Sequence, residues 1–155
     1  MQDNCTIDIR LLKVPPNYLP PPPLETGGGE VVFLGRTRGE HDPELGRLVA
    51  LKYDAYENLA LKKMREIATR AAREFHAIHI ILHHTVGKVP IGAPSVFIQV
   101  LCPHRTQAFG ACRFLIDQLK TSVPIWKCEI WEHGKTSWKD GTPVSTTGSS
   151  ASVND

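Results

Sequence analysis

The sequence predicts an α+β fold with a ferredoxin-like core, because apolar runs typical of strands and two amphipathic helical segments follow one another as β-α-β-β-α-β. This split βαβ order begins at residue 47, and the preceding segments add N-terminal strands. The 155 residues are 41% hydrophobic and 22% charged, a size and composition typical of one globular domain. The formal net charge of +2 is too small for a general nucleic-acid-binding surface, so no nucleic-acid partner is expected.

The first 29 residues differ in composition from the rest of the chain. A strand is predicted within residues 1–13, and residues 14–29 form a connector with six prolines that ends in three consecutive glycines. Proline removes a backbone donor and restricts φ, so the connector is expected to be extended. We interpret it as a spacer before the main domain, and a docking ligand for an aromatic groove is the alternative.

The main domain is predicted over residues 30–139. Apolar runs predict strands at 30–35, 47–53, 77–84, 95–101 and 126–132, and residues 41–46 are expected to form a hairpin loop between the first two. Helical spacing of apolar residues predicts helices at 57–75 and 106–120. The predicted apolar stripes are Leu61, Met64, Ala68, Ala71 and Phe75 in the first helix, and Ala108, Ala111, Cys112, Leu115 and Leu119 in the second.

Helices that pack on one face of a mostly antiparallel sheet leave its other face or an edge in need of cover, so we expect a dimer or a partner chain. Residues 140–155, rich in Gly, Ser and Thr, are predicted to be a mobile tail. The chain has no apolar run long enough to cross a bilayer, no signal-peptide pattern and four scattered cysteines. We therefore expect a soluble cytoplasmic protein without disulfides and without a membrane partner.

Two short segments place basic residues where an anion would bind. His104 and Arg105 stand at the start of the second predicted helix, where unpaired backbone amides favour anions; a helix cap and a solvated arginine are the alternative. Arg36 and Arg38 follow a buried strand and point the same way if that strand continues. A solvated strand end is the alternative interpretation of this arginine pair.

Two lysines flank the turn that follows the second predicted helix. Lys120 ends the helix and Lys127 begins the last strand, with Pro124 turning the chain between them. Their ammonium groups are candidates to face one pocket, where neighbouring cations lower the pKa of a lysine and permit nucleophilic or proton-donor roles. The alternatives are a lysine that complements the helix dipole and an outward residue of a strand. His79 and His83 share one strand face, but no third ligand has suitable spacing, so no metal site is predicted.

Four segments together resemble the family of large, catalytic subunits of molybdopterin synthase. They are FLGRTR (33–38), LVALKYDAY (48–56), HHTVGKVPIG (83–92) and, most specific, PHRTQAFGACRFLIDQLKTSVPIWKCE (103–129). The resemblance covers about residues 30–139. The N-terminal region departs from it, because prolines at 14–23 replace the helical pattern that the family usually has there.

The resemblance implies an enzyme that converts cyclic pyranopterin monophosphate to molybdopterin by inserting two sulfurs as a dithiolene. The sulfur arrives as a thiocarboxylate on the C-terminal glycine of a small ubiquitin-like subunit, in a heterotetramer with a central homodimer of large subunits. No cofactor is implied, since the partner supplies the sulfur. By this resemblance the catalytic residues are Lys120, beside the glycine carbonyl, and Lys127, beside the pterin. The implied substrate-binding residues are Arg36, Arg38, His104, Arg105, Cys128 and Glu129.

Two further functions are weighed against this enzyme. A non-catalytic ferredoxin-like module would use the same cations to hold the anionic C-terminal tail of a sulfur-carrier protein. RNA binding on the sheet is less favoured, because no strand has the aromatic-rich pattern of RNA-binding domains.

Overall fold

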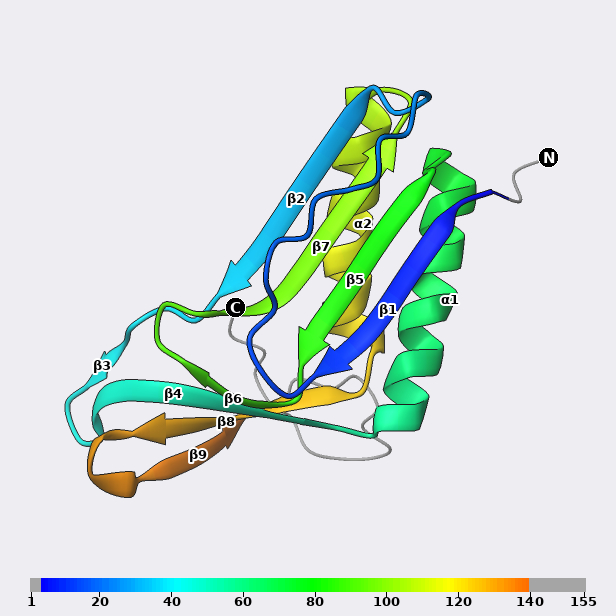
Figure 1. Ribbon diagram of the computed structural model, residues 1–155. Helices are drawn as coiled ribbons and strands as arrows, with labels where there is room; N and C mark the ends of the chain where they lie inside the picture. Colours follow the sequence, from blue (N-terminus) through cyan, green and yellow to red (C-terminus); the bar gives the residue numbers. More distant parts are fainter. Residues whose placement is uncertain (1–3, 140–155) are drawn as a thin grey trace.

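The computed structural model describes residues 4–139, which form two β-sheets and two α-helices (Figure 1). The strands are β1 (Thr6–Leu12), β2 (Gly29–Arg36), β3 (His41–Asp42), β4 (Gly46–Ala55), β5 (His79–Thr85), β6 (Gly87–Pro90), β7 (Pro94–Cys102), β8 (Ile125–Trp131) and β9 (Thr136–Lys139). The helices are α1 (Glu57–Phe75), α2 (Arg105–Ser122) and a 3-10 turn, η1 (Glu132–Gly134). Within this part of the chain, no helix has the length and apolarity needed to cross a membrane. The tail predicted at 140–155 lies outside the described residues.

The first sheet has the strand order β1-β5-β7-β2, and both helices lie on one of its faces (Figure 1). β1 is parallel to β5, whereas β7 is antiparallel to both of its neighbours, β5 and β2. The two segments that precede residue 47 thus add edge strands to this sheet, as predicted. Side chains alternate between the faces of a strand, and one set from β5 and β7 joins the helices in the core: Ile80, Leu82, Val96, Ile98 and Val100.

Each helix buries one stripe of small and apolar residues against this sheet. The bounds of α1 agree with the predicted helix, and its buried residues are Ala60, Met64, Ile67, Ala68 and Ala71. Leu61 was expected in this stripe but is 36% exposed, because the core face of α1 is taken by Ala60 and Met64. In α2 the predicted stripe is the buried one: Ala108, Ala111, Cys112, Leu115 and Leu119.

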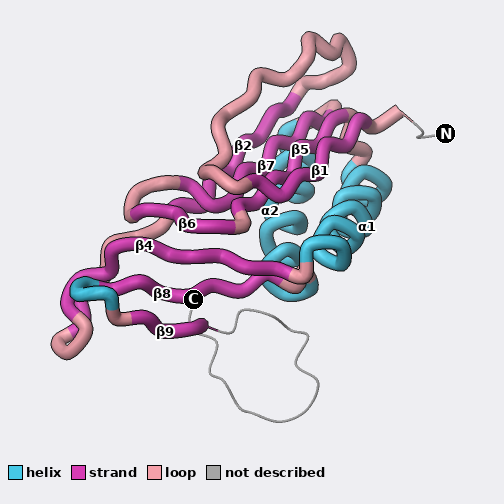
Figure 2. Tube along the Cα trace, turned by 60° about the horizontal axis from the view of Figure 1, so that its bottom comes forward, coloured by secondary structure: helices cyan, strands magenta, loops and turns pink. Residues whose placement is uncertain are grey.

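The second sheet has the order β3-β4-β8-β9, with β6 also paired to β4 (Figure 2). The α+β class and the order of elements are confirmed, but the ferredoxin-like arrangement in one sheet is wrong. β4 and β8 pair with each other in this second sheet, while β5 and β7 belong to the first. Periodicity in a sequence predicts that a segment is a strand, but it does not specify the partner strand.

The predicted hairpin between residues 30–35 and 47–53 is also wrong. β2 pairs with β7, and its register shifts between Gly35 and Arg36, where the chain leaves the first sheet. The tight turn joins β3 to β4 instead, with Gly46 at a φ of +80°, a conformation that favours glycine.

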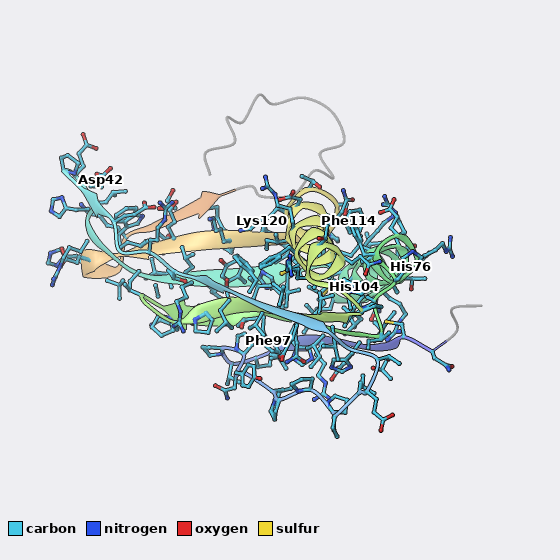
Figure 3. All side chains as sticks on the ribbon, turned by 90° about the horizontal axis from the view of Figure 1, so that it is seen from above. Asp42, His76, Phe97, His104, Phe114 and Lys120 are labelled. Atoms are coloured by element: carbon cyan, nitrogen blue, oxygen red, sulfur yellow. The ribbon has the colours of Figure 1, made fainter. Side chains whose placement is uncertain are left out.

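The proline-rich connector crosses the face of the first sheet opposite the helices (Figure 1). The side-chain amide of Gln99 donates to the backbone oxygen of Leu19 at 2.7 Å. The rings of Tyr18 and Phe97 meet edge to face with centroids 6.2 Å apart. Phe97 lies on the side of the sheet away from α2 (Figure 3). Phe97 and Gln99 are fully buried. The connector therefore covers part of the sheet face for which a second chain was expected.

Candidate functional site

A cavity of about 380 Å³ lies where the two sheets meet, beside the last turns of α2. Its wall combines β2 and the loop that follows it with parts of β4, β7, α2 and β8. The charged residues of the wall are Arg36, Arg38, Glu40, Lys120, Lys127 and Glu129. Four cations thus face two carboxylates, and this excess of positive charge favours an anionic ligand.

Both predicted catalytic lysines line this cavity. Lys120 lies in the last turn of α2, and Lys127 pairs with Tyr53 across β8 and β4. Alternation along β8 directs Lys127 and Glu129 to the cavity side of the sheet, and Lys127 is half-buried there. The alternative of an outward strand residue therefore does not describe Lys127.

Arg36 and Arg38 also line the cavity, although β2 ends at Arg36. A guanidinium nitrogen of Arg36 donates to the backbone oxygen of Gly92 at 2.9 Å, which attaches this arginine to the turn before β7. Thr37, between the two arginines, is buried and contributes to the same wall. The two arginines are thus presented by a loop that the β6–β7 turn supports.

Cys128 and Glu129 were both predicted to bind substrate, but only Glu129 lines the cavity. Glu129 is buried and lines the wall. Cys128 is buried on the other face of β8, opposite Trp138, and does not line the cavity. The structure thus places Cys128 on the opposite face of β8 from Lys127 and Glu129, because successive strand residues point to opposite faces.

His104 and Arg105 lie at the other end of α2 from Lys120. An α-helix rises about 1.5 Å per residue, so Arg105 and Lys120 are about 22 Å apart along the axis. Both residues of the pair are exposed, and the His104 side chain makes no capping hydrogen bond to α2. Within one chain, this pair, which the sequence predicts to bind an anion, does not reach the cavity that contains the lysines.

His84, which is not among the predicted site residues, is a buried neighbour of the cavity. Its ring meets the ring of Tyr53, a wall residue, with centroids 4.8 Å apart, and its Nδ1 lies 2.7 Å from the backbone oxygen of Thr85. Burial lowers the pKa of His84 to about 4; the contact with Thr85 opposes this shift, and the charge of Lys120 adds to it. The imidazole is therefore neutral near pH 7, beside a cation.

Burial also raises the pKa of Tyr53, against the opposing effect of a hydrogen bond with Ser95. Tyr53, Ser95 and Thr37 complete the polar wall, and none of them was predicted. Tyr53 could have been found from the sequence, because side chains alternate along the predicted strand at 47–53 and Tyr53 therefore shares a face with Leu51, another wall residue. For Thr37 and Ser95 the sequence offers no comparable signal.

His79 and His83, the two histidines predicted to share one strand face, are both buried. His79 Nδ1 lies 2.6 Å from the Thr6 hydroxyl, and His83 Nε2 lies 3.2 Å from a carboxylate oxygen of Asp8. Both histidines therefore contact β1, the neighbouring strand. Over residues 4–139, no group of three or more His, Cys, Asp or Glu side chains is placed to hold a metal ion.

Comparison with known proteins adds the family relationship. The family model described as MoaE protein matches residues 23–122, a range that includes Lys120 but ends before Lys127. The molybdopterin synthase catalytic subunit of Nostoc sp. (strain PCC 7120) is 39% identical over 112 residues, which cover 72% of this chain and 67% of the Nostoc protein.

Solved structures have the same fold. The crystal structure of molybdopterin synthase from Staphylococcus aureus matches with a TM-score of 0.68 and 29% identity, over 90% of this chain and 98% of that one. A protein–protein complex of subunits 1 and 2 of molybdopterin-converting factor from Helicobacter pylori 26695 matches with a TM-score of 0.64 and 20% identity. This second match covers 86% of this chain and 90% of the other.

Proposed function

The chain belongs to the MoaE protein family, and we propose that it is the catalytic subunit that converts cyclic pyranopterin monophosphate to molybdopterin. The two dithiolene sulfurs come from the C-terminal thiocarboxylate of a small ubiquitin-like subunit. The observation that carries this proposal is the cavity itself, in which Arg36, Arg38, Lys120 and Lys127 converge from three separate parts of the chain.

The charge of the cavity suits both reactants. The pterin substrate carries a cyclic phosphate and the carrier tail ends in a thiocarboxylate, so each brings an anion that guanidinium and ammonium groups bind. A volume of about 380 Å³ is within the range of small-molecule sites. Opening the cyclic phosphate and releasing the carrier carboxylate both develop negative charge, which positioned cations stabilise.

The two lysines take separate roles in this proposal. Lys120 contacts the glycine carbonyl of the incoming tail, and Lys127 contacts the pterin. Their positions on α2 and on β8 place them on different parts of one wall, so each can meet a different reactant. No resident cofactor is needed, because the carrier delivers the sulfur.

His104 and Arg105 enter the same reaction only if a second copy of the chain supplies them. They lie about 22 Å along α2 from Lys120, farther than one pterin monophosphate extends. A homodimer with a two-fold axis would bring the start of α2 from one copy to the cavity of the other. We place this homodimer at the centre of a heterotetramer in the cytoplasm, with one small subunit bound at each cavity.

The small subunit is the partner that this proposal requires. The similar Helicobacter pylori structure is a complex of subunits 1 and 2 of molybdopterin-converting factor, which supports a two-subunit enzyme here. The tail of the carrier would enter the cavity at Lys120, and its thiocarboxylate would meet the pterin there.

The direct test is a reconstituted reaction. The purified chain is mixed with thiocarboxylated small subunit and cyclic pyranopterin monophosphate, and dithiolene product is measured by mass spectrometry. Lys120→Ala and Lys127→Ala are expected to lose product, while Lys62→Ala, at an exposed position on α1, is expected to keep it. Full turnover by both cavity variants would refute the assigned chemistry. Carrier binding without any product would indicate the non-catalytic binding module instead.

The second-copy arrangement has its own test. Lys120→Ala and Arg105→Ala are each expected to be inactive alone, because each removes one half of every site. In a mixed dimer one of the two sites regains both residues, so random mixing should restore about a quarter of wild-type activity. A mixture that stays inactive would place the complete site within a single chain.

A further inference from the structure

Thr37 has a buried hydroxyl group that lacks a protein partner. The residue is 5% exposed and lines the cavity between Arg36 and Arg38. Its Oγ1 is buried and forms no hydrogen bond with any residue of the described range 4–139. A buried hydroxyl without a partner is rare in folded proteins and costs free energy, so its retention needs a reason.

Hydrogen bonds to the turn before β7 hold the backbone of Thr37 in place. The N–H of Thr37 donates to the backbone oxygen of Ala93 at 3.0 Å, and its C=O accepts from the N–H of Gly92 at 2.9 Å. Arg36 is attached to the same turn through the backbone oxygen of Gly92. Both backbone groups of Thr37 are therefore satisfied, and only its side-chain oxygen is left without a bond.

The surroundings define which ligand atom would complete this bond. Arg36 and Arg38 flank Thr37 in the chain, and Lys120 and Lys127 line the same cavity. Four cations raise the local concentration of anionic oxygens, which accept hydrogen bonds but do not donate them. A threonine hydroxyl can donate one hydrogen bond, so it matches such an acceptor.

We propose that the Thr37 hydroxyl donates a hydrogen bond to an anionic oxygen of a molecule bound in the cavity, and so helps to select and position that molecule. This inference rests on the proposed function, which supplies two such oxygens: a phosphate oxygen of the pterin and a carboxyl-type oxygen of the carrier tail. The loop 36–38 then acts as one unit, with two guanidinium groups for charge and one fixed hydroxyl for orientation.

The test compares Thr37→Val, which keeps the shape and removes the hydroxyl, with Thr37→Ser, which keeps the hydroxyl. Isothermal titration measures the Kd for cyclic pyranopterin monophosphate alone and, separately, for the unmodified small subunit alone. We expect Thr37→Val to weaken binding of one of the two by about tenfold or more, and Thr37→Ser to stay within about threefold of wild type. The ligand whose binding Thr37→Val weakens is the one whose anionic oxygen accepts the hydrogen bond from Thr37.

Thermal unfolding of the same variants separates this role from a structural one. A hydroxyl that has no partner in the protein contributes no stabilising bond, so Thr37→Val should unfold at the wild-type temperature or above it. A lower unfolding temperature for Thr37→Val with Thr37→Ser unchanged would mean that the hydroxyl bonds within the protein, and would overturn the inference. Unchanged binding of both ligands by Thr37→Val would overturn it as well. Wild-type protein that binds neither ligand would overturn the proposed function and this inference together.

Discussion

Acid should weaken this fold through His84, and the structure sets the size of the effect. Burial lowers the pKa of this imidazole from 6.5 to about 4 in the folded chain, with the Thr85 backbone oxygen opposing the shift and the Lys120 charge adding to it. The unfolded chain binds a proton at His84 below pH 6.5, whereas the folded chain does not until about pH 4. The stability that His84 contributes is therefore complete above pH 6.5 and is lost as the pH falls.

The magnitude follows from linkage. One pKa unit corresponds to about 1.4 kcal/mol, so the two pKa values give a loss of about 2 kcal/mol by pH 5 and about 3 kcal/mol by pH 4. For a domain with a total stability of about 5–15 kcal/mol, this is a large fraction from one side chain.

The assay is urea unfolding at pH 7.5 and pH 5 for wild type and for His84→Asn, whose amide can still donate to the Thr85 backbone oxygen but does not titrate. The loss of unfolding free energy between the two pH values should be about 2 kcal/mol larger in wild type than in the variant. His41→Asn, which replaces an exposed histidine, should follow the wild-type curve. If wild type and His84→Asn lost the same unfolding free energy between pH 7.5 and pH 5, the reasoning would be refuted, since protonation of His84 would then not be coupled to unfolding.

Two other predictions concern the connector and its contacts. Phe97→Ala should lower the free energy of unfolding in urea by about 3–5 kcal/mol, because the ring is fully buried; Tyr18→Ala, at a 52% exposed ring, should cost clearly less. Equal losses of unfolding free energy would contradict this prediction, because Tyr18 in the connector would then stabilise the fold as much as Phe97 in the sheet. Gly28→Ala should lower the thermal unfolding temperature, because an added Cβ would lie 2.2 Å from the backbone oxygen of Pro103. Gly39→Ala, whose Cβ would meet its nearest neighbour at 3.7 Å, should unfold like wild type, and similar values for the two alanine variants would contradict this steric argument.

Local patterns predicted the helices well. The apolar spacing over residues 57–75 matches α1, and the stripe from Ala108 to Leu119 is the buried face of α2. Helix formation depends on neighbours three and four residues apart, so a short window of sequence contains most of the relevant information. The exposed Leu61 marks the limit of this reasoning, since the part of a helix surface that meets the sheet is decided by packing.

The candidate site was predicted in part. Among the basic residues, Arg36, Arg38, Lys120 and Lys127 line one cavity, as the lysine spacing and the family resemblance suggested. Strand alternation, applied to the last strand, would have placed Cys128 on the opposite face from Lys127. Arg105 and Lys120 lie at opposite ends of α2, so the length of the helix keeps them apart. This separation can be calculated from the sequence only after both residues have been assigned to the same helix.

Properties carried by short stretches of chain were therefore available from the sequence: which segments are strands or helices, which residues bring positive charge, and which family they resemble. The tertiary structure alone decided that β4 and β8 form a second sheet and that the connector covers Phe97. It also decided that Thr37 is buried in the cavity wall and that His84 is buried behind the wall residue Tyr53. The reason is that strand pairing and burial depend on contacts between residues far apart in the chain, whose free energies no local pattern contains.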